Sequence, residues 1–230
     1  MSPAVRSPAR PSGPRPHGLA SDDVDVWWFP TARRPDAAPR TPARQDRTVR
    51  AVLGRYLRRT PDPDEIHGRC EHCGHPTHGR PRLRAGDITF NLSHIEGRTV
   101  VAVARRPVGV DTEPVSSGRA LLSAAETVFS ERERAGFQAR GALDVRLAAW
   151  SWCAKESLTK ATGHGLAVDP TTVHPPCPPP PHGRWVAAPF PDGRALWLTS
   201  ALLPGACVCA VAVDGPRPAA LRVRRWSADD

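Results

Sequence analysis

The sequence predicts an α+β fold built as two similar halves of about 100 residues each. Short stretches with strand character are interspersed with two well-formed helical patterns, at residues 46–59 and 143–161. The strand-like segment 98–104 also resembles the segment 206–213 in its run of valine and alanine, and each lies late in its half of the chain. A length of 230 residues is sufficient for two halves of this size.

The N-terminal half is expected to span residues 23–108, after a disordered segment at residues 1–22. That segment is rich in proline, serine and arginine and offers few residues for a core. The helix at residues 46–59 has apolar residues at the spacing of an amphipathic helix and is followed by Pro61 and Pro63. Apolar runs predict strands at 24–29, 88–92 and 98–104.

The C-terminal half is expected to span residues 109–215, followed by a polar tail at residues 216–230 whose few apolar residues pack back. A helix is expected at residues 123–138, because Ser123 followed by Glu126 three residues later resembles a capping box. The helix at 143–161 follows, and apolar runs predict strands at 108–113, 184–188, 195–202 and 206–213.

The composition favours an acidic partner and disfavours a membrane protein. The formal net charge is +9 and the pI is about 10.2, which suits nucleic acid, a phosphate-rich ligand or an acidic protein. No apolar run approaches the length of a membrane span, and the proline-rich N-terminus does not resemble a signal peptide. Six cysteines without a regular framework predict a cytoplasmic protein with reduced thiols.

The segment 66–82 is unusually rich in cysteine and histidine. Cys70 and Cys73, together with His75 or His78, are candidate zinc ligands, although the spacing is compressed. A basic zinc-knuckle protein that binds nucleic acid is therefore the alternative function. Few aromatic residues and the absence of an arginine-rich recognition helix argue against it. An ordinary loop with free thiols is the simpler interpretation of the segment.

The helix at 143–161 carries the only two lysines, Lys155 and Lys160, among 32 basic residues. An ammonium group, unlike a guanidinium, can give up its proton, so these two lysines indicate proton or phosphate chemistry. Trp152, Glu156 and Lys160 are four residues apart and share one arc. A solvated Glu–Lys pair is the simpler alternative, but a tryptophan on that arc should be covered by another layer or a ligand. The opposite arc is apolar and consists of Leu143, Leu147, Ala154, Leu158 and Ala161.

Two carboxylates lie on one face of the strand at 108–113. Alternation places Val108 and Val110 on one face, and Asp111 and Glu113 on the other. A cation between the two carboxylates would offset their repulsion, and Glu156 could be a third oxygen ligand, a set that suits magnesium. An ordinary exit from strand to loop is the alternative.

Three motifs in order resemble the signature of the 4′-phosphopantetheinyl transferases. They are Asn91–His94, Val108–Glu113 and Trp152–Gly163. The similarity is to the larger monomeric type that activates peptide and polyketide synthases in secondary metabolism. It covers about residues 24–215 and is clear for residues 79–165. The resemblance implies two α+β halves related by a pseudo-twofold axis, with coenzyme A and Mg²⁺ at their junction.

The resemblance also implies roles for individual residues. Asp111, Glu113 and Glu156 match the metal-ligand positions of the family. Glu156, Lys160 and His94 match the positions implied in catalysis, with Glu156 as the base that activates the attacking hydroxyl.

The coenzyme A-binding positions implied by the resemblance are more numerous. His94 and Lys160 match positions that bind the pyrophosphate, with Ser93 beside them. Lys155 matches the lysine that precedes the metal-binding glutamate. Further matches are Arg80, for the 3′-phosphate region, and the pair Arg47–Thr48 at the start of the first helix. Candidates in the upstream basic loop are Arg33, Arg34, Arg40 and Arg44.

The implied reaction moves the phosphopantetheine arm of coenzyme A onto a serine of an acyl or peptidyl carrier protein and releases adenosine 3′,5′-bisphosphate. The expected cofactor is Mg²⁺ and the co-substrate is coenzyme A, with Zn²⁺ at Cys70 and Cys73 as an additional option. The expected partners are carrier domains of peptide, polyketide or fatty-acid synthases, with no nucleic acid and no membrane. The protein is expected to act as a monomer.

Overall fold

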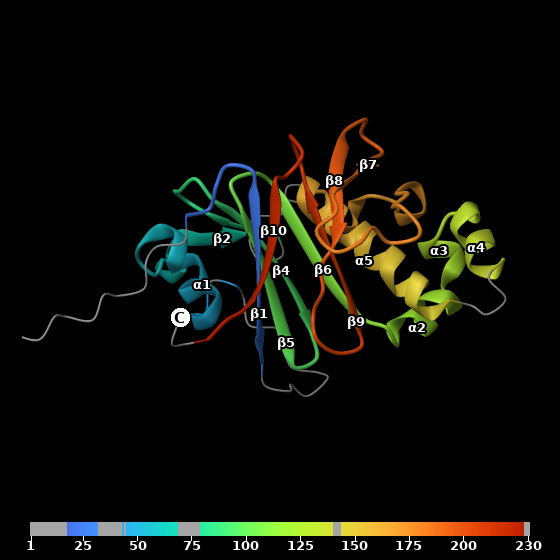
Figure 1. Cartoon of the computed structure of the whole chain (residues 1–230), viewed down its shortest axis with the longest axis horizontal. Helices are drawn as coiled ribbons and strands as arrows, with labels where there is room; N and C mark the ends of the chain where they lie inside the picture. The colour runs from blue at the N-terminus through green and yellow to red at the C-terminus, as the bar shows by residue number, and fades with distance from the viewer. Residues whose placement is uncertain (1–17, 32–42, 44, 69–78, 140–143, 228–230) are drawn as a thin grey trace, which may run out of the picture.

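The computed structural model describes residues 18–31, 43, 45–68, 79–139 and 144–227. It has a mixed α+β fold with two four-stranded sheets, each packed against helices (Figure 1). None of the described helices is both long and apolar enough to cross a lipid bilayer. The strands are β1 (Asp23–Pro30), β2 (Ile66–Gly68), β3 (Pro81–Leu83), β4 (Thr89–Ile95), β5 (Arg98–Ala104), β6 (Val108–Pro114), β7 (Val186–Pro189), β8 (Ala195–Ser200), β9 (Cys207–Val213) and β10 (Ala220–Arg225). The α-helices are α1 (Arg47–Leu57), α2 (Ser117–Ser123), α3 (Ala125–Val128), α4 (Glu131–Gln138) and α5 (Val145–Thr162), and 3₁₀ turns lie at Pro63–Glu65, Gly165–Ala167 and Pro170–Thr172.

The first sheet has the strand order β10-β1-β5-β4 and is covered on its outer face by α1. Asp46 caps α1, because its carboxylate accepts hydrogen bonds from the backbone N–H groups of Thr48 and Val49. The apolar face of α1 packs on the side chains of β1, β4 and β5 that point outward from the sheet. The separate pair β2–β3 lies beside this half.

The second sheet has the order β6-β9-β8-β7, and α5 lies on its outer face. Asp144 caps the start of α5 by accepting from the backbone N–H of Leu147, and Gly163 ends it in the left-handed region with φ of 85°. These bounds confirm the helix expected at 143–161 within two residues. The apolar side of α5 packs against outward-facing residues of β8 and β9.

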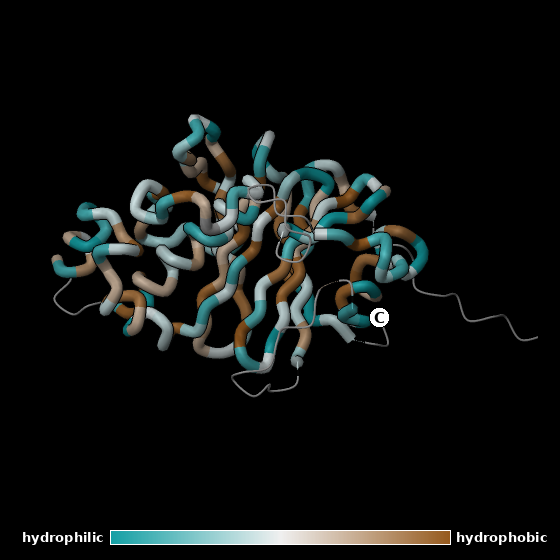
Figure 2. Tube along the Cα trace, turned by 180° about the vertical axis from the view of Figure 1, so that it is seen from behind, coloured by the Kyte–Doolittle hydropathy of each residue, from teal (hydrophilic) through white to brown (hydrophobic). Residues whose placement is uncertain are grey.

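The inner faces of the two sheets share one core. Val24, Val100, Val110 and Val211, from β1, β5, β6 and β9, belong to a single buried cluster. Figure 2 shows the hydrophobic residues concentrated along the central strands, with polar residues in the peripheral loops. The layer order is therefore α1, first sheet, second sheet, α5, which explains why the central strands are apolar on both faces.

Three strands of each sheet are connected and paired in the same way. In each, a first strand (β1 or β6) pairs antiparallel with the last strand of its half (β5 or β9), which pairs antiparallel with the strand before it (β4 or β8). A long helix, α1 or α5, follows the first strand in each case. The two segments of similar sequence, 98–104 and 206–213, form β5 and β9, the equivalent strands of this arrangement.

The single helix expected at 123–138 is wrong. The segment starts at the last residue of α2 and forms the two short helices α3 and α4. The capping box lies at Ser130 and Glu133 rather than at Ser123 and Glu126. Phe129, between α3 and α4, has an extended backbone and a buried side chain, and it breaks the helical run. Burial of that ring overrides local helix propensity here.

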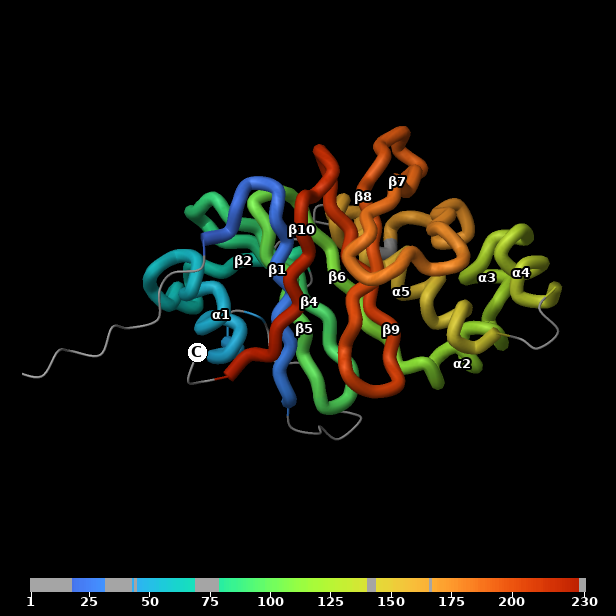
Figure 3. The backbone as a smooth tube through the Cα atoms, viewed as in Figure 1, coloured from blue at the N-terminus to red at the C-terminus, as the bar shows by residue number. Residues whose placement is uncertain are grey.

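The segment 216–230, expected as a polar tail, contributes the edge strand β10. It pairs in parallel with β1, so that residues near the C-terminus complete the sheet of the N-terminal half (Figure 3). Trp226 packs edge-to-face on Trp27 at a centroid distance of 5.7 Å. Of the segment 1–22, residues 1–17 lie outside the described residues, and Leu19 is buried in the cluster beneath α1.

The zinc-ligand candidates Cys70, Cys73, His75 and His78 also lie outside the described residues, as do the upstream candidates Arg33, Arg34, Arg40 and Arg44.

A buried polar network fixes β10 to β1 and α1. The carboxylate of Asp25, which is 1% exposed, accepts from Arg222 Nε on β10 at 2.7 Å and from the Tyr56 hydroxyl at 2.8 Å. Trp27 Nε1 in turn donates to the Tyr56 oxygen at 2.6 Å. Burial, together with the nearby negative charge of Asp25, raises the pKa of Tyr56 far above its usual value, so the hydroxyl remains a donor.

Removing Arg222 should therefore destabilise the protein strongly. Arg222→Ala leaves the Asp25 carboxylate buried without its cation, which typically costs about 3–5 kcal/mol. The matched control is Arg225→Ala on the same strand, where the arginine is exposed and stacks on Trp28. Loss of this cation–π contact should lower the free energy of unfolding by less than about 1 kcal/mol. Urea unfolding followed by tryptophan fluorescence measures both, and equal losses would contradict a special role for the Asp25 network.

Candidate active site

The site is built where β6 crosses α5 in close contact. Gly109 on β6 faces the helix so closely that a Cβ atom there would lie 2.0 Å from the Ser157 carbonyl oxygen and 2.5 Å from the Ala161 nitrogen. Only glycine allows this approach. The contact positions the next residues of β6 that point to the same side, Asp111 and Glu113, against the C-terminal half of α5.

Helix α5 is buried along most of its surface, and the arc expected from the sequence stands out. Trp152, Glu156 and Lys160 are each partly exposed, whereas most of their neighbours are buried. Trp152 is covered by another layer, because it packs against the cluster that contains Phe129 and Phe137. The arc is therefore an open edge of α5 that leads from α4 to Asp111.

The Asp111 carboxylate is the centre of the site. Its Oδ1 accepts from Lys160 Nζ at 2.6 Å and from Ser93 Oγ at 2.9 Å, and the residue is 4% exposed. Its Oδ2 is buried and has no hydrogen-bond partner. Lys160 also approaches the Val110 carbonyl at 3.4 Å. A buried carboxylate oxygen without a donor is costly, and such a position is suited to a cation or a polar ligand.

Polar side chains of β4 join the two halves at this point. Ser93 Oγ accepts from the backbone N–H of Thr112 at 3.0 Å while its proton goes to Asp111. Asn91 Oδ1 accepts from the backbone N–H of Val110 at 3.5 Å. Strands β4 and β6 belong to different sheets and are not paired through their backbones. The side chains of Ser93 and Asn91 provide the hydrogen bonds between them. Ser93 thus positions Asp111, and its hydroxyl proton is already used, which differs from the expected contact with phosphate.

The charged groups around Asp111 perturb one another. Burial, and then the charge of Asp111, raises the pKa of Glu113, with a smaller contribution from Glu156. Burial also raises the pKa of Glu156, an effect that Lys160 opposes and Asp111 reinforces. For Lys160, burial lowers the pKa, but the adjacent Asp111 outweighs it and the net direction is upward. Lys160 therefore stays a cation, while the two glutamates are held closer to neutrality than exposed carboxylates.

The residues fit a divalent cation in chemical type, but their side chains are not gathered around one point. Among the described residues, no three His, Cys, Asp or Glu side chains lie close enough together to hold a metal ion. The donors are nevertheless hard carboxylate oxygens, which Mg²⁺ prefers, and Asp111 Oδ2 is an acceptor without a partner.

Lys155 does not belong to this group. Its side chain is 1% exposed, and its ammonium donates to Glu133 Oε2 at 2.8 Å, to the Val128 carbonyl at 3.0 Å and to the Pro170 carbonyl at 2.6 Å. Three acceptors use all three N–H donors, so none remains for a phosphate. This geometry differs from the coenzyme A contact expected from the sequence and gives Lys155 a structural role.

His94 lies on the other face of β4 from Ser93. Its Nδ1 is 2.7 Å from the hydroxyl of Thr99 on β5, on the side of the sheet that α1 covers. Helix α1 runs antiparallel to β1, because Tyr56 near its C-terminus reaches Asp25 near the start of β1. Its first residues, Arg47 and Thr48, consequently lie toward the end of the sheet that carries His94.

Arg80 is placed at the junction between the halves. Its guanidinium donates to the carbonyl of Ala161 in the last turn of α5 at 3.0 Å and to the carbonyl of Val108 at the start of β6 at 3.2 Å. A cation next to the last carbonyls of a helix is favourable. Arg80 therefore fastens α5 to β6 at the end opposite to Glu113.

Three residues that hold the site were not singled out in the sequence. Gly109 and Asn91 lie inside the recognised motifs, and their roles depend on contacts between strands that no local pattern predicts. Glu133 accepts from Lys155, from the Ser130 backbone N–H at 2.9 Å and from the Ser151 hydroxyl. The Ser130–Glu133 capping box was the available signal for it.

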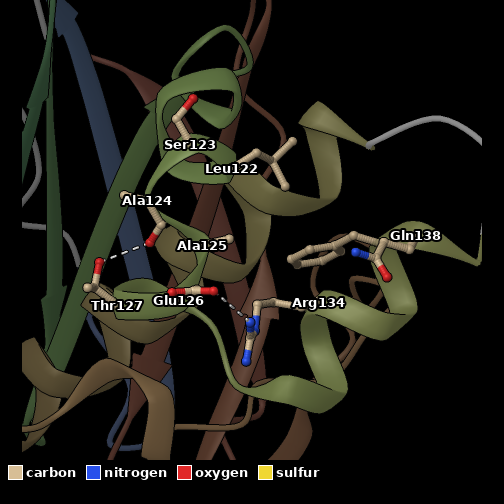
Figure 4. A pocket seen from close by; sticks show the side chains of 9 residues that line it. Leu122, Ser123, Ala124, Ala125, Glu126, Thr127, Arg134 and Gln138 are labelled. Carbon is tan, nitrogen blue, oxygen red and sulfur yellow. Dashed lines mark hydrogen bonds and ion pairs between the residues drawn. The ribbon is translucent and has the colours of Figure 1, made fainter.

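A pocket of about 480 Å³ lies elsewhere, between α2, α3 and α4. Arg134 of α4 and Glu126 of α3 form an ion pair of 3.8 Å at this pocket. Figure 4 shows the two side chains pointing toward each other, with Gln138 of α4 also at the pocket. None of the residues near Asp111 lines this pocket, so the chemistry of the candidate site does not depend on it.

Lys155→Ala should unfold the protein more readily rather than impair one chemical step. The change leaves Glu133 buried without its cation, at a typical cost of about 3–5 kcal/mol. Lys155→Met fills the same volume but leaves the same carboxylate unpaired, so it should be nearly as harmful. Double replacement of Lys155 and Glu133 by Met and Gln should recover part of the loss in chemical denaturation. Single variants as stable as the wild type would contradict the structural role.

Glu156→Gln should stabilise the metal-free protein at neutral and alkaline pH. Because folding raises the pKa of Glu156, its contribution to stability is present below its unfolded pKa and is lost as the pH rises through the folded value. The glutamine variant avoids that loss, and each 1 kcal/mol gained raises Tm by roughly 2–4 °C. Calorimetry at pH 8 should show the gain, and it should shrink toward pH 5. A variant less stable at pH 8 would contradict the cited pKa direction.

Comparison with known proteins agrees with this geometry. Residues 107–188 match the family model of the 4′-phosphopantetheinyl transferase superfamily, a segment that contains β6 and α5. The chain is also 34% identical over 84 residues to the 4′-phosphopantetheinyl transferase gsp of Aneurinibacillus migulanus. That alignment covers 36% of this chain and 34% of the relative, so the chain spans about a third of the curated relative's length. The segment that carries Asp111, Glu113, Glu156 and Lys160 is thus the part of the chain that is similar to the 4′-phosphopantetheinyl transferase superfamily.

Proposed function

We propose that this protein transfers the 4′-phosphopantetheine arm of coenzyme A to a serine hydroxyl of an acyl or peptidyl carrier protein. The observation that carries the proposal is the Asp111 carboxylate, held at Oδ1 by Lys160 and Ser93, with a buried Oδ2 that lacks a partner. It lies between the two halves and within the matched segment. A partly exposed cation and two further carboxylates with raised pKa values surround it.

In the proposed reaction the serine oxygen attacks the β-phosphorus of coenzyme A. A bond forms between that oxygen and phosphorus, and the bond from the β-phosphorus to the bridging oxygen breaks, which releases adenosine 3′,5′-bisphosphate. The serine proton has to be accepted as the new bond forms, because a neutral hydroxyl is a weak nucleophile.

Glu156 is the proposed base. It is partly exposed on the open edge of α5, and burial raises its pKa toward the operating pH, which suits a group that must accept a proton and later release it. Lys160, two residues short of the end of α5, is the proposed phosphate ligand on the leaving side. Its raised pKa favours a role as a fixed positive charge over a role as proton donor.

His94, Arg47 and Thr48 are proposed to bind the remaining phosphates of coenzyme A. They lie toward one end of the first sheet, on its α1 side, which is the opposite face of β4 from the contact between Ser93 and Asp111. Arg80 and Ser93 are proposed to act indirectly, by holding α5, β6 and Asp111 in place. Lys155 is left out because its donors are already used.

Asp111, Glu113 and Glu156 are the residues proposed to hold Mg²⁺, which when bound would offset the negative charge of the pyrophosphate. Two halves related by a pseudo-twofold axis are part of the same proposal, supported by the matching order of three strands in each sheet, β1-β5-β4 and β6-β9-β8. The protein is proposed to work as a monomer in the cytoplasm, and the free thiols of Cys153, Cys207 and Cys209 among the described residues are consistent with a reducing compartment.

The decisive experiment is the mass of an apo carrier protein after incubation with this protein, coenzyme A and Mg²⁺. We expect a gain on the order of 340 Da, the mass of one phosphopantetheine group, which is absent when EDTA is added. Glu156→Gln should reduce the rate at least about 10²-fold while the variant remains folded. No gain with any of several unrelated carriers would overturn the proposed function, and wild-type rates for Glu156→Gln would remove Glu156 as the base.

A further inference from the structure

Arginine and tryptophan side chains gather where the first sheet ends. Trp28 on β1 carries the Arg98 guanidinium 5.1 Å from its ring centroid and the Arg225 guanidinium at 5.5 Å. The strands align these residues, because Trp28 pairs with Arg225 of β10 and Arg98 begins β5 next to Pro30 of β1. The guanidinium groups of Arg98 on β5 and Arg225 on β10 thus both stack on the ring of Trp28 on β1.

An exposed apolar residue belongs to the same end of the molecule. Arg98 lies against the loop between β8 and β9, since a Cβ atom on Gly205 would be 3.7 Å from its Nη2, and its Nη1 donates to Cys207 Sγ at 3.2 Å. That loop contains Leu202, which is 69% exposed and is the one large apolar side chain of the described residues that is exposed to this degree. The group Trp28, Arg98, Leu202 and Arg225 is called the arginine–tryptophan end.

This end adjoins the candidate site through β6 and β9. Cys207 pairs with Pro114, the last residue of β6, which follows Asp111 and Glu113 on that strand. Figure 3 shows β1, β6 and β10 finishing toward the same side of the molecule, where the loop between β8 and β9 also lies. A macromolecule seated on this end would therefore be next to the strand that carries the carboxylates.

We propose that the arginine–tryptophan end docks the acidic surface that surrounds the target serine of the carrier protein. The inference rests on the proposed function and adds the surface that would recognise the protein substrate. An exposed leucine on a loop that Arg98 contacts suits an acidic protein surface with an apolar centre, whereas a polyanion would leave Leu202 uncovered. Charges at such a rim mainly raise the association rate and select the partner.

The test compares charge reversal at two matched arginines. Arg225→Glu alters the arginine–tryptophan end, and Arg217→Glu is the control. Arg217 is also exposed and stacks on a tryptophan, Trp197, at 5.7 Å, but it lies between β9 and β10 at the other end of the strands. Both changes alter the net charge equally, so a difference between them reports position rather than total charge. Circular dichroism confirms that each variant is folded.

We expect Arg225→Glu to lower kcat/KM for an apo carrier protein about five- to tenfold, while the KM for coenzyme A and the kcat at saturating carrier stay unchanged. Arg217→Glu should change kcat/KM less than about twofold, and 0.5 M salt should narrow the gap. Leu202→Asp should also raise the KM for the carrier. Equal effects of the two reversals, in a protein that transfers phosphopantetheine, would overturn the docking surface and leave the proposed function intact.

A binding measurement separates this inference from the proposed function. Titration calorimetry of apo carrier protein into Glu156→Gln, with and without Arg225→Glu or Arg217→Glu, reports affinity without transfer. If Arg225→Glu weakens carrier binding and Arg217→Glu does not, the result supports the docking surface whether or not transfer is observed. If the carrier binds and neither reversal matters, the docking surface is wrong. If no carrier binds, both the surface and the carrier substrate are wrong.

Discussion

The contact between β6 and α5 at Gly109 is the constraint on which the candidate site depends. With a larger residue there, the helix would have to move away from the strand, and Lys160 could not stay 2.6 Å from the Asp111 carboxylate. The same contact lets the second sheet bury β6 on both faces, one against the shared core and one against α5. The site is thus supported by two packed layers rather than by a loop, which favours precise positioning of its charges.

The two lysines of α5 show how one helix can hold two ion pairs with different tasks. Lys155 points into the molecule, has three acceptors and a side chain 1% exposed, and ties α4 and the turn at Pro170 to the helix. Lys160 is 26% exposed and shares a carboxylate whose second oxygen has no partner. The first pair completes its hydrogen bonding within the fold, whereas the second leaves an acceptor that a ligand can use. Chemistry should therefore be sought at Lys160.

Much of this arrangement was accessible from the sequence because it depends on local periodicity. Alternation placed Asp111 and Glu113 on one face of β6, and helical spacing placed Trp152, Glu156 and Lys160 on one arc of α5, as the structure shows. The contacts that cross between strands were not accessible. The structure places the Ser93 hydroxyl on Asp111 and the Lys155 ammonium on Glu133, and no local pattern predicted either contact. The edge strand β10 was missed because its three arginines resemble a solvated tail, and its partner β1 is distant in the sequence.

The pairing of β10 with β1 has a consequence for synthesis of the chain. Asp23 pairs with Ala220, so the sheet of the N-terminal half cannot be completed until the residues of β10 have left the ribosome. Until then the nascent N-terminal half exposes one edge of β1 and the buried carboxylate of Asp25 lacks its cation. Folding of the N-terminal half before the C-terminal half is thereby disfavoured. The two halves instead reach their native state together, when the last strand closes a loop of nearly the whole chain.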